Sequence, residues 1–208
     1  MSKNTSSENS EIDYEDFWMG KFSKVREHGL LERIPDSYIQ DKFNLMGLKN
    51  IVEDFDEAHM AISDNGPSLN ILEETKLYYY THQRYITFNK QGMSSMLDKI
   101  KNKEFGCCPR YGCKEAMTVP IGISNEYGKS KTKIYCYNCN NCYEPKGSLK
   151  KLDGCIWGTA FAPMLILSNP YHFKPKPVKT FVPKLFGFTV NYEIEEQGNS
   201  ASSSIEDD

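Results

Sequence analysis

The chain has 208 residues, of which 39% are hydrophobic and 12% aromatic, and this composition is typical of a globular protein of one or two domains. The formal net charge of -3 gives no general attraction to nucleic acid, and no apolar run reaches the ~18 residues of a membrane span. The opening residues include no apolar signal region, so we expect a soluble intracellular protein with reduced cysteines.

The first half of the chain carries helical patterns. Residues 1–10 are small, polar and unpatterned, and they predict a disordered tail, whereas residues 11–103 predict a helical domain. Ser10 is placed to cap a first helix that contains Trp18 and Phe22 and ends near residue 29.

Two helices are predicted next. Asp36 opens a helix over residues 36–45, with Ile39 and Phe43 on one face. Apolar residues then recur at intervals of three and four over residues 48–62, which predicts one amphipathic helix.

The last two helices of this domain follow a turn rich in Asp, Asn, Gly and Pro. Ser68 is placed to cap a helix that continues through the run LYYYTHQRYITF. Since this helix is aromatic nearly all round, we expect it in the middle of the domain. A fifth helix is predicted from Met93 to Ile100.

Six of the seven cysteines lie between Phe105 and Tyr143. A Cys-x4-Cys pair and a Cys-x2-Cys pair give four thiolates in two tight turns, as a closed tetrahedral zinc site requires. The intervening residues are enough for two strands, predicted over 117–121 and 131–135. We therefore expect a zinc ribbon over residues 104–167 with one structural Zn²⁺ per chain. The candidate ligands are Cys108, Cys113, Cys136 and Cys139.

The register of these ligands has alternatives. Cys107 adjoins Cys108, and Cys142 repeats the x2 spacing after Cys139. Pro109 favours Cys108, because a proline after the first ligand pre-sets the turn that aims the next amides at the sulfur. Free thiols or a disulfide cluster are the competing interpretations. Four thiolates leave no open coordination position, so we do not expect catalytic zinc.

The remainder of the chain is less regular. Residues 154–167 predict a strand and then a short helix from Pro163. Residues 168–192 predict an extended Lys/Pro-rich arm that ends in a strand, with Phe186 and Phe188 on one face. These two rings suit either this protein's own core or a partner surface. Residues 193–208 predict a disordered acidic tail. The fold class expected is α+β, with an all-helical domain before the ribbon and arm.

Other candidate sites are weaker. No nucleotide-binding, kinase or serine-hydrolase motif occurs and the four histidines are scattered, so no enzymatic activity is expected. Four hydroxyl residues in the tails precede acidic residues, which suits an acidophilic kinase. These candidate phosphosites are Thr5, Ser10, Ser203 and Ser204.

Several segments together resemble one family. They are DSYIQDKFNLMGL, HQRYITFNKQGMSSML, FGCCPRYGC, IYCYNC, DGCIWGTAFAPML and PKLFGF. From about residue 12 to residue 192 the chain resembles the regulatory beta subunit of casein kinase II, a protein serine/threonine kinase.

The resemblance implies a non-catalytic subunit that forms a homodimer through its zinc ribbons. The dimer would hold two catalytic alpha subunits in a two-plus-two tetramer and modulate their activity, stability and choice of protein substrates, in the cytoplasm and nucleus. The family's zinc ligands correspond to the four cysteines given above, and its docking aromatic pair corresponds to Phe186 and Phe188.

Two departures from the family pattern are visible. Phe186 stands where the family usually has a tyrosine, so a hydroxyl contact is absent while the ring is kept. The family's long acidic loop is shortened here to about residues 63–67, and an acidic patch lies nearby on the preceding predicted helix. The residues of this acidic patch are Glu53, Asp54, Asp56 and Glu57.

A rival interpretation is a nucleic-acid-binding zinc ribbon, supported by the basic, tyrosine-containing stretch from Lys129 to Lys151. Against it, the acidic N-terminal half would repel phosphate. A third interpretation, a disulfide-linked secreted module, would require oxidised cysteines.

Overall fold

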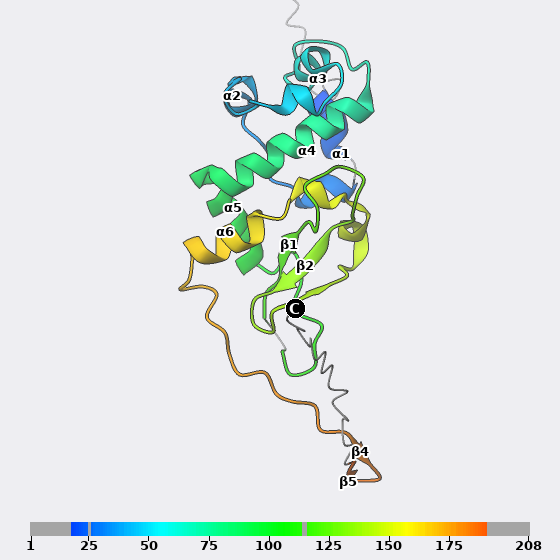
Figure 1. The fold of residues 1–208 in the computed structure, drawn as a ribbon, viewed down its shortest axis with the longest axis vertical. Coiled ribbons are helices and arrows are strands. Elements are labelled where there is room, and N and C mark those ends of the chain that lie inside the picture. The colour runs from blue at the N-terminus through cyan, green and yellow to red at the C-terminus, as the bar shows by residue number, and fades with distance from the viewer. Residues whose placement is uncertain (1–17, 25, 114–115, 191–208) are drawn as a thin grey trace, which may run out of the picture.

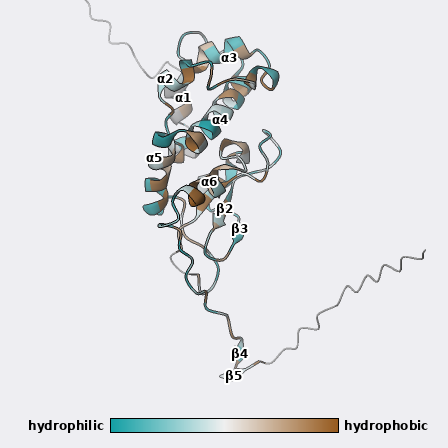
Figure 2. Cartoon of the chain, turned by 60° about the vertical axis from the view of Figure 1, so that its left-hand side comes forward, coloured by the Kyte–Doolittle hydropathy of each residue, from teal (hydrophilic) through white to brown (hydrophobic). Residues whose placement is uncertain are grey.

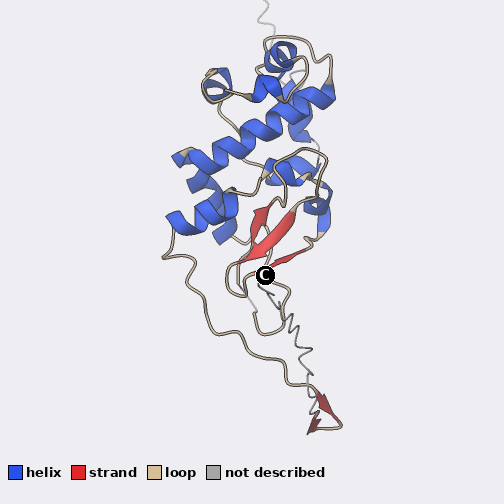
Figure 3. Ribbon diagram, in the orientation of Figure 1, coloured by secondary structure: helices blue, strands red, loops and turns tan. Residues whose placement is uncertain are grey.

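The computed structural model describes residues 18–24, 26–113 and 116–190. Helices come first along the chain, a small sheet follows, and an arm descends from the last helix to a terminal hairpin (Figures 1 and 3). The α-helices are α1 (Trp18–Lys24), α2 (Asp36–Gln40), α3 (Phe55–Ile62), α4 (Ile71–Phe88), α5 (Lys90–Lys101) and α6 (Phe161–Ser168). The strands are β1 (Val119–Ile121), β2 (Lys133–Cys136), β3 (Asn141–Tyr143), β4 (Lys184–Leu185) and β5 (Phe188–Thr189). Short 3-10 helices are η2 (Arg26–Leu30), η3 (Leu48–Asn50), η4 (Gly147–Lys151) and η5 (Gly154–Ile156).

Helix α4 is the centre of the helical part, as its aromatic sequence predicts. Leu77, Tyr78 and Ile86 are buried, and α3, α5 and α6 all pack against this helix. Its N-terminus differs from the prediction, because Asn70 is the cap and accepts a hydrogen bond from the Glu73 amide. Ser68 instead donates its hydroxyl to the buried carboxylate of Glu74.

The helix predicted over residues 36–45 is wrong in its second half. Helix α2 ends at Gln40, and the carboxylate of Asp41 then accepts a hydrogen bond from the amide of Phe43. Such a local side-chain bond offers the backbone a turn in place of the next helical turn. Phe43 is consequently 73% exposed, while Ile39 is buried as expected.

The single helix predicted over residues 48–62 is also wrong. The segment contains η3, a turn and then α3, and Asp54 has a left-handed backbone with φ 49°. The amide of Glu53 donates to the carboxylate of Glu73 on α4 at 2.9 Å. Because this amide is satisfied by another helix, the backbone turns away from the helical path before Phe55.

The three-stranded sheet is antiparallel in the order β1-β2-β3. Val119 is opposite Tyr135, and Ile134 is opposite Tyr143. Strands β1 and β2 lie inside or next to the predicted segments, whereas β3 was not predicted. Its three residues Asn141–Tyr143 are mostly exposed and too few to show the alternating pattern by which a strand is recognised.

The strand predicted at the start of residues 154–167 is wrong, although the short helix after it is present as α6. The carboxylate of Asp153 accepts a hydrogen bond from the Cys155 amide and caps η5 instead. Trp157 follows, fully buried, and its indole N–H donates to the hydroxyl of Thr132 at 2.9 Å. An apolar run that is buried on all sides does not distinguish strand from helix by pattern.

One continuous hydrophobic core runs from Trp18 to Phe173 and includes residues of both the helices and the sheet. His82 of α4 bonds to backbone groups on both sides of the predicted domain boundary. Its Nδ1–H donates to the carbonyl of Ile156 at 3.0 Å, and its Nε2 accepts from the amide of Glu32 at 3.1 Å. The core thus extends across residues 103 and 104, and the division there into two domains stays a prediction.

The arm beyond α6 has no regular structure until its end, as predicted, but that end is a hairpin and not one strand. Strands β4 and β5 pair antiparallel, with Leu185 opposite Phe188. The two residues between them, Phe186 and Gly187, have φ values of 48° and 88°, as in a two-residue type I′ turn. The hairpin lies at the far end of the arm from the helices (Figure 2).

Within the residues that the structure describes, no helix combines the length and the apolar character needed to cross a membrane.

Candidate metal centre

Two short loops bring the cysteines together. The first loop, residues 108–113, begins where the amide of Cys108 donates to the carbonyl of Ala116, and it closes where the amide of Cys113 donates to that of Arg110. The second loop, residues 136–139, starts at the last residue of β2 and leads into β3. We call these the first and second cysteine loops. Each loop ends in a tight turn in which one residue has a positive φ. This residue is Gly112 in the first loop and Asn140, directly after the second loop.

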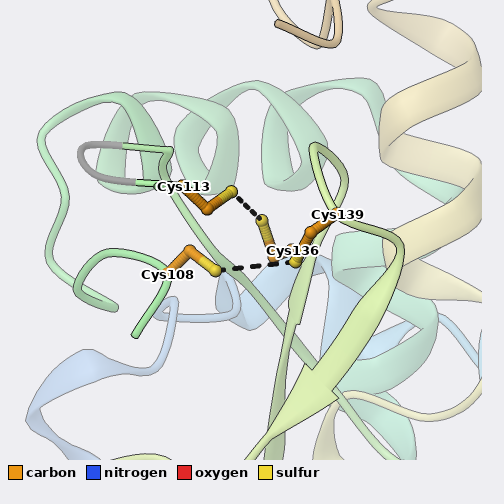
Figure 4. Close-up of side chains that lie close together, drawn as sticks. All are labelled: Cys108, Cys113, Cys136 and Cys139. Carbon is orange, nitrogen blue, oxygen red and sulfur yellow. Dashed lines mark hydrogen bonds between the residues drawn. The ribbon is translucent and has the colours of Figure 1, made fainter. Parts of the chain in front are cut away.

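The four sulfurs form a compact cluster (Figure 4). The Sγ atoms of Cys108 and Cys139 are 3.6 Å apart, those of Cys113 and Cys136 are 3.7 Å apart, and all four lie within 4.8 Å of one another. A tetrahedral zinc ion with bonds of about 2.3 Å places its sulfurs ~3.8 Å apart. A disulfide would need about 2.0 Å. The donor set and its spacing therefore fit a structural zinc ion.

The other cysteines stay outside this cluster, which agrees with the predicted register. Cys107 is exposed and pairs through its backbone with Met117, and Cys142 is exposed on β3 opposite Tyr135. Cys155 is fully buried in the main core. All seven cysteines are free of disulfides.

The surroundings of the sulfurs disfavour the thiolate form at two cysteines and favour it at one. Burial raises the pKa of Cys108 and of Cys136. Burial also acts to raise the pKa of Cys139, but hydrogen bonds from the Tyr143 hydroxyl and from neighbouring thiols outweigh it and lower the pKa to about 7. Four ionised sulfurs this close repel one another, so a bound cation is the natural way to stabilise them.

Two residues that sequence patterns do not reveal donate hydrogen bonds to these sulfurs. The Nδ2 of Asn138 lies 3.1 Å from the sulfur of Cys113, and the Tyr143 hydroxyl lies 3.1 Å from the sulfur of Cys139. Such donors orient metal ligands and stabilise their charge. The only sequence signal for them is their position, between or just after the ligands of the second pair.

The cluster has no place for a substrate, because all four coordination positions of a tetrahedral ion would be taken by protein sulfurs. Cys113 and Cys136 are buried, and Ala116, Tyr143 and Val178 pack around the sulfurs. The arrangement is compatible with a structural metal site.

The predicted docking aromatics are displayed on the hairpin and do not enter the core. Phe186 is 93% exposed and Phe188 is 79% exposed. Leu185 beside them is also exposed, so the hairpin presents apolar surface that nothing in the described part of the chain covers.

The acidic patch lies in the turn before α3 and in the first turn of that helix. All four of its residues are exposed. Asp56 pairs with Lys49 at 2.9 Å, and this hydrogen bond lowers the pKa of its carboxyl group. The candidate phosphosites Thr5, Ser10, Ser203 and Ser204 lie outside the described residues.

The basic stretch that suggested nucleic acid is partly neutralised. Lys133 forms an ion pair with Glu144, and Lys129 forms one with Glu126 at 3.7 Å. These two pairs reduce the positive charge of the stretch but do not remove it, because Lys131, Lys150 and Lys151 line the same surface pocket as Lys133 and Glu144.

Known proteins similar to this chain agree on one family. The model of the casein kinase II regulatory subunit family matches residues 17–189. The chain is 32% identical to casein kinase II subunit beta of Dictyostelium discoideum over 207 residues, covering 94% of this chain and 77% of that protein. It is 38% identical over 188 residues to casein kinase II subunit beta' of Drosophila melanogaster, covering 85% of each. It is also 34% identical over 186 residues to a suppressor-of-stellate-like protein of the same fly, covering 89% of this chain and 84% of the relative.

Proposed function

The chain belongs to the casein kinase II regulatory subunit family, whose members are not catalytic, and we propose that it is a zinc-dependent homodimer that holds two catalytic alpha subunits. The observation that carries the proposal is the exposed aromatic hairpin at the end of an arm, in a chain that also holds a cysteine cluster fitting structural zinc. The assembled kinase would act on protein substrates, with this chain modulating its activity, stability and substrate choice.

Zinc has an indirect role in this proposal. Structural zinc contributes on the order of 10 kcal/mol of folding free energy, which is enough to fix a small sheet and two loops as a rigid surface. Such a surface, formed by the proposed ribbon of residues 104–167, can pair with the same surface of a second copy. Dimerisation then presents two hairpins, one for each catalytic subunit.

The hairpin supplies the docking contact. Phe186 and Phe188 lose most of their exposed surface if they enter a groove on a catalytic subunit, and buried aromatic anchors typically dominate such interfaces. If both are hot spots, replacing either ring by alanine costs roughly 2 to 4 kcal/mol of binding free energy.

The remaining parts take secondary roles. The proposed helical domain of residues 11–103 carries the acidic patch, which would attract basic segments of substrates with a strength that falls as salt rises. The arm and docking hairpin occupy residues 168–192. Phosphorylation of the candidate tail residues would add charge to segments that are already acidic. We place the protein in the cytoplasm and nucleus.

Light-scattering mass and zinc content, measured alone and after mixing with a casein kinase II alpha subunit, test the proposal. We expect one zinc per chain, a dimer alone and a two-plus-two complex on mixing. The variant carrying Phe186→Ala and Phe188→Ala should remain a zinc-loaded dimer and lose the complex. Phe43→Ala is a matched control, because this phenylalanine is 73% exposed but lies in the helical part.

Two results would reject the proposal. One is a zinc-loaded monomer that does not bind the alpha subunit. The other is a Phe186→Ala, Phe188→Ala variant that binds the alpha subunit as tightly as the wild type does. Tight DNA binding with a steep salt dependence would favour the nucleic-acid interpretation instead.

A further inference from the structure

Part of the arm packs against both cysteine loops. We call residues 173–181 the strap. The ring of Phe173 meets that of Tyr137 edge-on, with centroids 5.2 Å apart, and Val178 packs against the sulfur cluster. The ring of Phe181 meets that of Tyr111 in the same way at 5.3 Å. Tyr137 belongs to the second cysteine loop and Tyr111 to the first, so the strap spans both.

Asn138 is bonded to the cluster and to the strap at the same time. Its Nδ2 donates to the sulfur of Cys113, while its Oδ1 accepts from the backbone amide of Lys176 at 2.5 Å. Both ends of this one side-chain amide are therefore occupied. A shift of the cysteine loops moves the acceptor that Lys176 uses.

Gly112 provides the second point of close approach. A Cβ atom at this position would lie 2.3 Å from the carbonyl oxygen of Lys179, which is far inside contact distance. The first cysteine loop and the strap can therefore touch only because residue 112 has no side chain.

These contacts end shortly before the hairpin. Phe181 is the last residue of the arm with a described contact to a cysteine loop, and β4 starts at Lys184. Whatever fixes the strap therefore fixes the starting point of the hairpin, to within a few residues of extended chain.

We propose that the cysteine loops fasten the strap and so set the position of the docking hairpin, with Asn138 as the positioning residue that links a metal ligand to the arm. The proposal rests on the function above in one respect only, namely that the hairpin docks on a catalytic subunit. The fastening itself is a property of this chain and can be measured without a partner.

Trypsin gives a readout that is internal to the arm. Lys174 and Lys176 each precede proline, which blocks cleavage, so the arm from residue 170 to residue 190 has two cleavable bonds, after Lys179 and after Lys184. The first lies in the strap against Gly112, whereas the second lies in the hairpin. We define the cleavage ratio as the initial rate of cleavage after Lys179 divided by that after Lys184. Measured by mass spectrometry on the zinc-loaded full chain, it reports how firmly the strap is held.

Each test variant has a matched control. Asn138→Ala removes the bonds to Lys176 and to the sulfur of Cys113. Asn141→Ala removes an asparagine whose side chain, among the described residues, bonds to the carbonyl of Cys139 and not to the strap. Gly112→Ala introduces the clash with the strap. Gly106→Ala imposes the same strain of a positive φ, with no atom within 4 Å of the new Cβ. Zinc content is measured for all four variants.

In the wild type, cleavage after Lys179 should be slower than after Lys184. The loss of one hydrogen bond corresponds to roughly a threefold to tenfold change in an opening equilibrium. We therefore expect Asn138→Ala and Gly112→Ala to raise the ratio by about that factor, and both controls to stay within about twofold of the wild type. The proposal is overturned if either test variant keeps the wild-type ratio, or if the controls rise as far.

Binding to the alpha subunit separates this inference from the proposed function. A released strap should weaken binding by a similar factor while the hairpin remains intact, because docking must then order the arm. If the double aromatic variant binds like the wild type while the cleavage ratios behave as expected, docking is refuted and the fastening stands. If docking is lost in that variant but all cleavage ratios match the wild type, the fastening is refuted and docking stands.

Discussion

His82 should make the folded protein sensitive to mild acid. Its imidazole is completely buried between α4 and η5, where both ring nitrogens have backbone partners and Trp157 packs edge-on at 5.6 Å. Burial lowers the pKa of His82 from 6.5 to about 4, although the Ile156 carbonyl acts in the opposite direction. The unfolded chain therefore takes up this proton at a higher pH than the folded chain does.

The size of the effect follows from that difference in pKa. Because the folded-state pKa is lower, the stability contributed by neutral His82 is fully present above pH 6.5 and is lost as pH falls towards 4. The complete loss is about 3 kcal/mol, of which about 2 kcal/mol falls between pH 7 and pH 5.

Urea unfolding of the wild type and of His82→Gln, at pH 7 and pH 5 in the same zinc buffer, measures this loss. The variant should be less stable at pH 7, since the Trp157 contact is disturbed, but its free energy of unfolding should fall by about 2 kcal/mol less on acidification. If His82→Gln loses as much stability as the wild type between the two pH values, His82 is not held neutral by burial.

Three further predictions concern the core and the metal centre. Thr132→Val should destabilise the protein by about 1 to 3 kcal/mol, because the buried indole N–H of Trp157 loses its acceptor; urea unfolding would show this, and a cost near zero would mean that the bond is unimportant. Glu74→Ala removes the acceptor of the Ser68 hydroxyl and of two backbone amides before α4, so we expect the free energy of unfolding to fall by about 2 kcal/mol or more in the same assay. The control Glu57→Ala, on the exposed face of α3, should change it by less than about 0.5 kcal/mol. Cys136→Ser should abolish zinc binding and the dimer, as measured by zinc content and light scattering, while Cys142→Ser should keep both; equal zinc content in the two variants would refute the ligand assignment.

The parts of the fold that sequence predicted are those fixed by local chemistry. The aromatic run of α4 requires burial on every face, and two closely spaced cysteine pairs can bring four sulfurs together through short turns. These features depend on residues near one another in the chain, so their patterns are visible without a structure.

The errors have two physical causes. Local carboxylates end the helix after Gln40 and cap η5 in place of a strand, and elsewhere a distant group takes over a local backbone bond. The carboxylate of Glu73 takes the amide of Glu53 and interrupts a segment with clear helical periodicity. Likewise, Asn138 is an ordinary residue in the sequence and acquires its role because the fold brings the sulfur of Cys113 and the amide of Lys176 beside it. The paired strands at the end of the arm depend on Phe186 adopting a positive φ, a conformation that is uncommon for bulky residues.

The shared core has a consequence for synthesis of the chain. Helix α4 is complete at Phe88, but Ile156 and Trp157, which cover His82, are made roughly 70 residues later. At translation rates of about 5 to 20 residues per second, the ribosome needs roughly 3 to 14 s to make that stretch. During this time the most aromatic helix of the protein lacks its final packing partner. Contacts of such long sequence separation slow folding, so chaperones that shield apolar helices should associate with nascent chains of this length.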